Sequence, residues 1–278
     1  MWGMTSNAAP GRSAGHPFDA AVRLTQVGEG RFGGHTSAEY ANMVGPFGGV
    51  TAATLLRAVQ VDPRCAGDPV ALTVNYAGPL AQGPFTVEAE PVRTNRRTQH
   101  WALTMLQDDV VAATATAIVG ARPETWADTE AVPPSAPSAD EVKIADLAGL
   151  VPWTDNYEFR FVDGAPDLGT GPHPTSATTL WVRDHPARPL DHPALVALSD
   201  VFIPRIMMRR GEYVPSGTVT LTVYFHAGPD LIAAQADRPI LATAGSDRLG
   251  LGFADQSVRL WTPEGGLLAT SHQMVYFK

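Results

Sequence analysis

The histidines and the cysteine of this sequence do not form a metal-binding motif. The eight histidines are scattered, and none has H-x-x-E-type zinc spacing. Cys65 is the one cysteine, so no intrachain disulfide is expected and no second thiol is present to share a metal. The sequence lacks the G-x-x-x-x-G-K-[ST] loop that binds nucleotide phosphates. We therefore expect neither a metal nor nucleotide-cofactor chemistry.

Two glycines stand where a helix is predicted to begin. The segment GPFGGVTAATLLRAVQV, which starts at Gly45, predicts a turn followed by an apolar helix. The first N–H groups of a helix lack partners inside it, and the helix dipole is positive at that end. Gly48 and Gly49 could therefore bind a carbonyl oxygen or a phosphate at close approach. A turn or a close helix–helix contact explains them equally well.

Three arginines cluster at a predicted turn between two strands. They are Arg93, Arg96 and Arg97. Guanidinium groups suit phosphate, so this cluster is a candidate docking patch for a phosphorylated ligand. A solvated hairpin end is the alternative, and we favour it.

The elements that must position these residues occur as two copies of one plan. Each copy has an apolar helical segment followed by four strands, and the second helix is expected in HPALVALSDVFIPRIMM. LTVNYAGP in the first half matches LTVYFHAGP in the second, and VVAAT matches LLATS. A long helix wrapped by a curved antiparallel sheet is a hotdog unit. We predict an α+β double hotdog with two long helices, in which the two sheets pair edge to edge.

A change in composition separates the copies. Residues 121–155, rich in Pro, Ala, Ser and acidic residues at their start, are predicted to be a linker that need not pack. Residues 18–120 form the predicted N-terminal repeat and residues 156–278 the C-terminal repeat, after a flexible leader over 1–17. No signal peptide and no apolar run of 18 residues are present, so we expect no membrane span and a cytoplasmic location.

Composition limits the kinds of partner. The chain has 278 residues, of which 44% are hydrophobic and only 17% charged. It carries 20 basic against 28 acidic residues, a formal charge of −8, which disfavours nucleic-acid binding. A low charge content is typical of a chain with much of its surface covered by protein, either between the two halves or between subunits.

The chain resembles the acyl-CoA thioesterase II family, in which both hotdog copies lie on one chain. The resemblance runs from about Ala21 to the C-terminus, except for the linker, and is sharpest in ALSDVFIPR, GTVTLTVYFH and LATSHQMVYF. It implies hydrolysis of a fatty or related acyl-CoA to the free acid and CoA. It implies no separate cofactor, because coenzyme A is part of the substrate. It also makes a homo-oligomer, such as a dimer of double hotdogs, a possibility.

The resemblance implies a site made of Asp200, Thr218 and Gln273, which together hold and polarise a water molecule. Met274 departs from the family, which commonly has a carboxylate there. The residue types suit thioester hydrolysis, because a carboxylate can take a proton from water while a hydroxyl and an amide orient it. The leaving thiol has a pKa of about 8.5, so no strong general acid is needed. Direct attack by Asp200 stays open.

Aligning the two copies predicts one site per chain. Gly49 falls opposite Asp200, and Thr116 falls opposite Gln273, so the first copy lacks the polar set. Strand alternation places Thr220 and Thr222 on the same face as Thr218.

Two other functions use the same fold. A hydratase or dehydratase needs an Asp–His pair, and no histidine has helical spacing beside Asp200. His226 is expected to be structural, and His272 is expected to face away from its neighbour Gln273. A non-catalytic acyl-CoA-binding protein is the remaining alternative.

Overall fold

The computed structural model describes residues 15–147 and 149–278. The first copy contains α1 (Pro17–Ala21), β1 (Thr25–Gly28), β2 (Arg31–His35), η1 (Ala38–Tyr40), α2 (Gly48–Val61), β3 (Asp68–Tyr76), β4 (Pro84–Thr94), β5 (Thr98–Gln107) and β6 (Val110–Gly120). The second contains η3 (Pro152–Asn156), β7 (Tyr157–Asp163), β8 (Thr178–Asp184), α3 (His192–Leu198), α4 (Arg205–Arg210), β9 (Ser216–Phe225), α5 (Pro229–Gln235), β10 (Ile240–Gly245), β11 (Leu249–Gly250), β12 (Phe253–Trp261) and β13 (Leu267–Phe277). Strands β2 and β7 were not predicted from the sequence.

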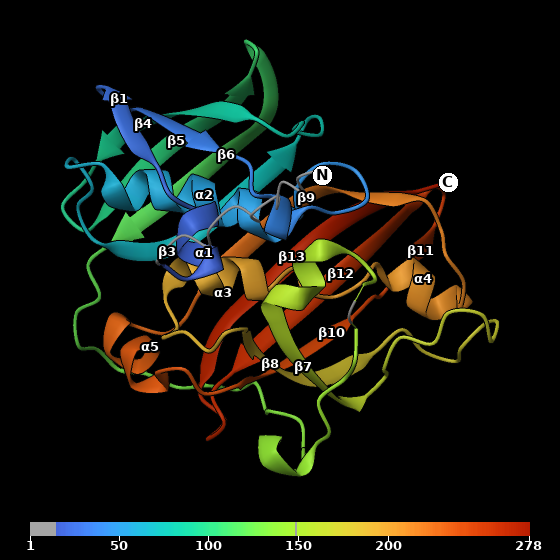
Figure 1. Cartoon of the computed structure of the whole chain (residues 1–278). Helices are drawn as coiled ribbons and strands as arrows, with labels where there is room; N and C mark the ends of the chain where they lie inside the picture. The colour runs from blue at the N-terminus through green and yellow to red at the C-terminus, as the bar shows by residue number, and fades with distance from the viewer. Residues whose placement is uncertain (1–14, 148) are drawn as a thin grey trace, which may run out of the picture.

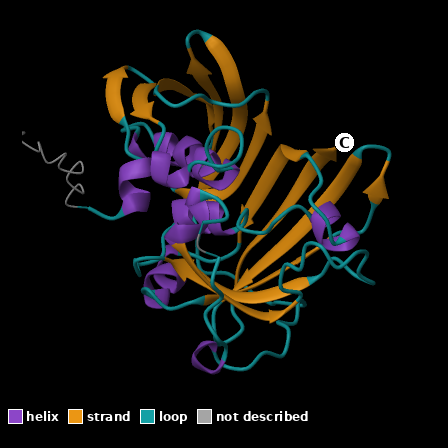
Figure 2. Cartoon of the chain, turned by 45° about the vertical axis from the view of Figure 1, so that its right-hand side comes forward, coloured by secondary structure: helices purple, strands orange, loops and turns teal. Residues whose placement is uncertain are grey.

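The strands form one continuous sheet that joins the two copies (Figure 1). Its order is β1-β2-β4-β5-β6-β3-β9-β13-β12-β10-β8-β7, with β11 paired to β12. The copies meet at the antiparallel pair β3–β9, where the hydroxyls of Thr73 and Thr222 lie 3.1 Å apart. Helices α2 and α3 contact each other and lie on one side of the sheet (Figure 2). The predicted α+β double hotdog and its edge-to-edge pairing are confirmed.

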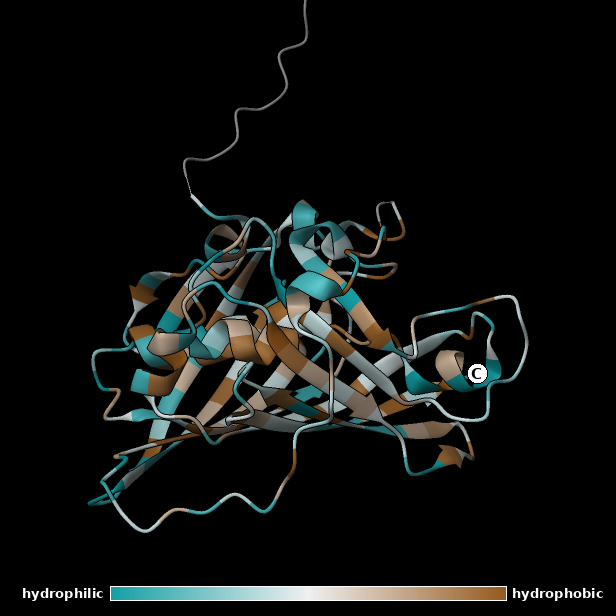
Figure 3. Ribbon diagram, turned by 90° about the horizontal axis from the view of Figure 1, so that it is seen from below, coloured by the Kyte–Doolittle hydropathy of each residue, from teal (hydrophilic) through white to brown (hydrophobic). Residues whose placement is uncertain are grey.

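Helix α2 is buried over most of its length. Its residues from Gly49 to Leu56 are all buried, as are Ala58 and Val59. It packs against α3 and against β4, β5 and β6, and Figure 3 shows hydrophobic helical segments lying against the sheet. Its N-cap residue, Phe47, provides no side-chain hydrogen bond, so the first N–H groups of α2 are open to another partner.

The helix predicted over residues 192–208 is interrupted, which corrects the sequence analysis. Asp191 caps the start of α3 by accepting a hydrogen bond from the amide of Ala194 at 2.8 Å, and the helix ends after seven residues. A new helix, α4, starts directly after Pro204. Proline lacks an N–H group and disfavours helical geometry in the preceding residue, so one helix cannot run through this point. Asp200 therefore lies in the turn that follows α3.

The linker packs against the protein, contrary to the prediction that it need not. Ala131, Ala136, Ala139 and Val142 cover an outer-face cluster of large side chains on the second copy, formed by Trp181, Leu241 and Trp261. The Trp181 indole N–H also donates to the carbonyl of Pro137 at 2.9 Å. The outer face of β8, β10 and β12 is apolar here as well as the inner face, so burial of that face favours a covering segment.

Helix α1 begins at Pro17, which is the last residue of the predicted leader. Residues 1–14 of that leader lie outside the described residues. Within it, His16 caps α1 by accepting a hydrogen bond from Phe18 N at 3.1 Å, and its Nε2 lies 2.7 Å from the carbonyl oxygen of Pro186. The end of the predicted leader is thus part of the fold. No helix in the described residues is long and apolar enough to cross a membrane.

Candidate active site

Asp200 and Gln273 form the centre of the site. The Gln273 Nε2 group donates a hydrogen bond of 2.7 Å to Oδ1 of Asp200. Asp200 comes from the turn after α3, and Gln273 lies in the middle of β13, so helix and sheet each contribute one partner. Both side chains are buried. The structure thus brings together two of the three residues that the resemblance implied.

The carboxylate of Asp200 also meets the N-terminus of α2. The backbone amide of Gly49 is its second hydrogen-bond partner. A Cβ atom on Gly48 would lie 2.8 Å from Oδ2 of Asp200, so only glycine leaves room for the carboxylate there. A Cβ on Gly49 would lie 2.8 Å from the carbonyl oxygen of Ala197, which shows that this glycine serves the close contact of α2 with α3.

The contact between Asp200 and the start of α2 bears on the prediction that Gly48 and Gly49 bind a substrate oxygen. The N–H of Gly49 is already engaged by Asp200. The N–H of Gly48 makes no hydrogen bond with any other described residue, and it lies at the positive end of the α2 dipole. Gly48 is therefore the better candidate of the two for binding a substrate oxygen, and this role stays a prediction.

Burial raises the pKa of Asp200 to about 7. Removal of the carboxylate from water is the larger effect, and the hydrogen bonds from Gln273 and Gly49 oppose it. A carboxylate with this pKa is present in both forms at neutral pH. It can take a proton from water far more readily than a surface aspartate, whose pKa is near 4.

A β-bulge determines which way Thr218 faces. Thr218 pairs with Val275 and Thr220 pairs with Met274, so β9 contains one extra residue between these pairs. Val275 is buried on the inner face while Met274 is exposed, and paired residues share a face. Thr218 therefore lies on the inner face with Gln273. Thr220 pairs with Met274 and Thr222 with His272, which are both exposed, so the prediction that these two threonines share the face of Thr218 is wrong. Within the described chain, no hydrogen bond joins Thr218 to Asp200 or Gln273.

The register also corrects the alignment of the two copies. Leu72 pairs with Ala117 in the first copy, just as its counterpart Leu221 pairs with Gln273 in the second. Ala117, rather than the exposed Thr116, is therefore the counterpart of Gln273. An alanine at this buried position confirms that the first copy lacks the amide.

Gly49 and Asp200 are likewise not equivalent positions. Gly49 is the second residue of α2, whereas Asp200 follows the end of α3. The two residues are instead partners across the junction of the copies. The first copy thus contributes the start of a helix to a carboxylate carried by the second.

Tyr76 is a neighbour of this site that the sequence analysis missed. It ends β3, and its hydroxyl donates a hydrogen bond of 2.8 Å to the carbonyl of Gly48. Burial and the nearby charge of Asp200 raise the pKa of Tyr76, so it stays protonated. Tyr76 lies in the repeated LTVNYAGP segment, which was the available sequence signal. In the structure, the end of this strand lies beside the first residue of α2.

The two histidines weighed as rivals lie elsewhere. His272 is exposed, and its Nδ1 lies 2.8 Å from the hydroxyl of Ser257. His226 Nε2 lies 2.9 Å from the hydroxyl of Thr270. Neither is a hydrogen-bond partner of Asp200 in the part of the chain that is described. The expectation that His272 and Gln273 face opposite sides of β13 is confirmed.

The arginine cluster is remote from Asp200. Arg93, Arg96 and Arg97 are exposed around the β4–β5 turn. This turn lies at the end of the sheet where Thr98 and Asp68 both pair with Gly120. Tyr76 is at the other end of β3, about 26 Å away at the usual rise per residue. The structure does not bring these arginines to the site, and their role in phosphate docking stays a prediction.

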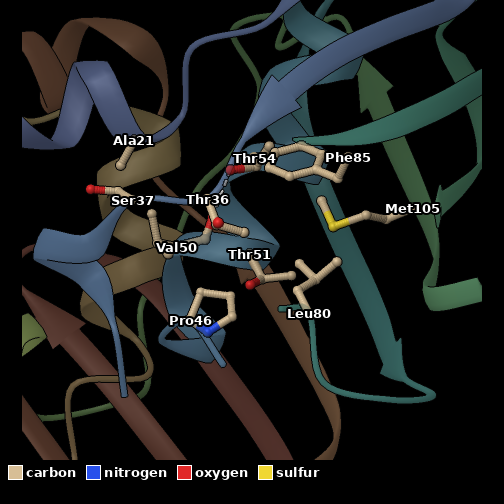
Figure 4. A pocket seen from close by; sticks show the side chains of 10 residues that line it. All are labelled: Ala21, Thr36, Ser37, Pro46, Val50, Thr51, Thr54, Leu80, Phe85 and Met105. Atoms are coloured by element: carbon tan, nitrogen blue, oxygen red, sulfur yellow. Dashed lines mark hydrogen bonds between the residues drawn. The ribbon is translucent and has the colours of Figure 1, made fainter. Parts of the chain in front are cut away.

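A small apolar pocket lies between α2 and the first sheet. Val50, Leu80, Phe85 and Met105 are among the side chains that line it (Figure 4). Its volume is about 10 Å³, which is room for about one water molecule. Across residues 15–147 and 149–278, no three His, Cys, Asp or Glu side chains gather as a metal-ligand group.

The fold and this single polar set define a double-hotdog protein of the thioesterase type. Residues 36–120 match the model of the acyl-CoA thioesterase N-terminal domain, and residues 123–277 match that of the C-terminal domain. The chain belongs to the acyl-CoA thioesterase family and is a thioester hydrolase.

Solved structures agree with the fold. A conserved protein of unknown function with a hot dog fold from Alicyclobacillus acidocaldarius is 46% identical, with a TM-score of 0.91 over 95% of this chain and 99% of that one. An acyl-CoA thioesterase II from Mycobacterium marinum is 19% identical, with a TM-score of 0.73 over 94% and 98% of the two chains. A search of curated proteins found no match.

Proposed function

We propose that this protein hydrolyses the thioester of a fatty or related acyl-CoA, and that Asp200 activates the attacking water. The observation that carries the proposal is the buried contact between Asp200 and Gln273 at the start of α2. A general base works best when its pKa is close to the working pH, and the pKa of Asp200 is about 7.

In the proposed reaction, ionised Asp200 accepts a proton while the water oxygen attacks the thioester carbonyl carbon. Gln273 holds Oδ1 of the carboxylate, and a carboxylate can accept more hydrogen bonds than the two from Gln273 and Gly49, so it can also accept one from the water. The hydroxyl of Thr218, on the same inner face, is a candidate to orient that water. The carbon–sulfur bond then breaks, and the proton held by Asp200 passes to the departing thiolate. This returns Asp200 to its ionised form.

The negative charge on the carbonyl oxygen needs a donor in the transition state. The unpartnered amide of Gly48 and the positive end of α2 support this role for the helix N-terminus. Tyr76 holds the carbonyl of Gly48 and thereby fixes the orientation of this first turn.

The other candidate functions have weaker support. Hydration of a double bond on this fold calls for an Asp–His pair, and the partners of Asp200 are an amide side chain and a backbone amide. A non-catalytic binding protein has no need of a buried carboxylate that an amide side chain and the start of α2 hold at the junction of the two copies.

Release of free thiol from a panel of acyl-CoAs tests the proposal. Asp200→Asn is expected to lower kcat/KM by at least about 10²-fold, as for the loss of a general base. Asp184→Asn is a matched control, because Asp184 is also buried and its pKa is also raised to about 7, but Gln273 does not contact it. Equal activity in Asp200→Asn and wild type removes Asp200 from the mechanism. Hydration of an enoyl-CoA without thiol release would instead support the hydratase.

Single turnover in oxygen-18 water separates water activation from direct attack. If Asp200 activates water, the label enters the product acid alone. If an anhydride forms and is hydrolysed at its aspartyl carbonyl, the label enters the Asp200 carboxylate, which peptide mass spectrometry detects.

A further inference from the structure

A buried arginine lies beyond Gln273 and has no carboxylate partner. Arg205 is 1% exposed and forms no ion pair with any described residue. Its partners are neutral oxygens of Ser176, Thr178, Ile203 and Gln256. Burial lowers the pKa of Arg205 to about 9, so the side chain remains a cation at neutral pH. Burying a cation without a counter-ion costs folding free energy, and the hydrogen bonds of Arg205 offset part of that cost.

The bond from Arg205 fixes the orientation of one glutamine. Arg205 Nε donates to Oε1 of Gln256 at 3.1 Å. Arginine has no acceptor, so the oxygen of Gln256 must face it and the NH₂ group must face the other way. Gln256 is 1% exposed, so water does not reorient it freely.

Gln256 and Gln273 are direct cross-strand neighbours. They pair between β12 and β13, and both point to the buried inner face. Cβ atoms of such a pair are about 5 Å apart, within reach of two amide dipoles. No hydrogen bond links the two amides in the described structure, so their coupling is through the orientation of these dipoles. The NH₂ group of Gln256 attracts the side-chain oxygen of Gln273. When that oxygen faces Gln256, the NH₂ group of Gln273 faces Asp200.

Asp200 and Arg205 both belong to the segment around the α3–α4 connection. They stand at its opposite ends, with Gln256 hydrogen-bonded to Arg205, Gln273 hydrogen-bonded to Asp200, and the two glutamines paired across β12 and β13. The row is Arg205, Gln256, Gln273, Asp200. An ionised carboxylate can only accept hydrogen bonds, so the direction of the Gln273 amide matters for it.

We infer that Arg205 and Gln256 are positioning residues, which hold the Gln273 amide with its NH₂ group toward Asp200. This rests on the proposed function of Asp200 as the base. A mere clamp on the α3–α4 connection would use the same contacts, but it would not depend on the direction of the amides.

Gln256→Glu separates the two roles. The new carboxylate has the shape of the glutamine and supplies the counter-ion that Arg205 lacks, so the fold should be retained. Its second oxygen faces Gln273 and attracts the NH₂ group, which turns the Gln273 oxygen toward Asp200. We expect the pKa of Asp200 to rise by about one pH unit or more and kcat/KM at pH 7 to fall at least about fivefold, as the ionised fraction of Asp200 does.

The pKa is measured by NMR on protein with carboxyl-labelled aspartate, where Asp200→Asn identifies the signal. This readout does not require turnover, so it tests the positioning row even if the proposed hydrolysis fails. Tyr76 and Tyr157 are the other titratable groups whose electrostatic interaction with Asp200 is resolved, and both stay neutral over the range because burial raises their pKa.

A double-mutant cycle separates orientation from simple charge repulsion. Gln256→Glu is compared in the wild type and in Gln273→Met. If the effect passes through Gln273, the rise in the Asp200 pKa in the Met background falls to less than half of its value in the wild type. Equal rises in the two backgrounds would overturn the inference, as would no rise in the first.

Gln235→Glu is the matched control. Gln235 is also fully buried in the second copy, and its Oε1 lies 3.4 Å from Nη2 of Arg238. The same isosteric change beside an arginine should leave the Asp200 pKa unaltered and kcat/KM within about twofold, since Gln235 is not among the described hydrogen-bond partners of Asp200. An equal shift in this control would mean that any buried carboxylate produces the effect, and it too would overturn the inference.

Discussion

Oδ2 of Asp200 occupies the space next to Gly48 in which any other residue would place its Cβ, only 2.8 Å from that position. The carboxylate comes from the second copy and the glycine from the first, so the site exists only where the two copies meet. The short α3 makes this contact possible, because it ends just before Asp200 and leaves the side chain free to turn toward α2. The duplication therefore does more than build a scaffold, since neither copy contains the whole arrangement.

Gly48→Ala should lower activity without unfolding the protein. The added methyl group forces the Asp200 carboxylate away from the first turn of α2, while alanine is a better helix former than glycine by about 1 kcal/mol. We expect kcat/KM to fall by about 10-fold to 100-fold, because a displacement of about 1 Å in a catalytic group has effects of this size. Thiol-release kinetics and urea unfolding measure the two quantities.

Gly245→Ala is the control for this substitution. Gly245 ends β10, and a Cβ there would meet no atom within 4 Å. Its activity should equal that of the wild type. Wild-type kcat/KM in Gly48→Ala would show that the closeness of Asp200 to Gly48 is not needed for catalysis.

The activity should rise with pH through a midpoint near 7. The ionised form of Asp200 is the base, and burial raises the pKa of this carboxyl to about 7. Below that pH, kcat/KM is expected to fall about tenfold for each pH unit. Asp184 has a similar pKa but is not bonded to Gln273, so Asp184→Asn should leave this midpoint in place. A midpoint near 4 would indicate a solvated carboxylate and contradict the site described above.

Asp200→Asn should be inactive and yet more stable at pH 8. The pKa of Asp200 is about 7 in the folded protein, against 3.8 for an unperturbed aspartate. The folded state therefore binds the extra proton, and stability falls as pH rises from about 4 to about 7. Three pH units correspond to about 4 kcal/mol, and we expect the variant to recover about 2–4 kcal/mol of this.

Urea unfolding at pH 8 and at pH 3.5 measures this gain. At the lower pH the carboxyl of Asp200 is mostly protonated in both states, so the stability difference from the variant should shrink. An equal difference at both pH values would show that the buried charge is not its cause.

The sequence predicted the repeated elements because they depend on local periodicity and turns. The match of LTVNYAGP with LTVYFHAGP placed β3 and β9 correctly, and these strands join the two sheets. The resemblance named Asp200 and Gln273, which lie in contact. The bulge that turns Thr218 inward could not be predicted, because one extra residue in a strand leaves no periodic signal.

The missed features involve contacts between residues distant in sequence. The linker was judged by its composition, but the outer-face cluster that it covers, centred on Trp181 and Trp261, comes from strands of the second copy. The break in the predicted helix was signalled by Pro204, which the apolar spacing of HPALVALSDVFIPRIMM outweighed. The positions of Tyr76 and Gln256 near the site depend on the pairing of distant strands, so the sequence alone did not indicate a role for them.

Enlarging the pocket beside α2 should change the preferred acyl chain. Pro46 and Val50, on either side of the Gly48–Gly49 pair, line this pocket together with Phe85 and Met105, and its volume is only about 10 Å³. We expect the acyl chain to enter between helix and sheet here, so that the small volume of this pocket limits its length. Met105→Ala should increase the ratio of kcat/KM for decanoyl-CoA over butanoyl-CoA by about 10-fold, the effect of a few methylene groups in an apolar pocket.

Leu103→Ala distinguishes this effect from a general loosening of the core. Leu103 is buried on the same strand and the same face as Met105 but does not line the pocket. Each alanine substitution should cost about 2–5 kcal/mol of stability. If both variants shift the chain-length ratio equally, looser packing is the cause. If Met105→Ala alone shifts it, the pocket receives the end of the acyl chain, and the first copy sets the substrate length for a base carried by the second.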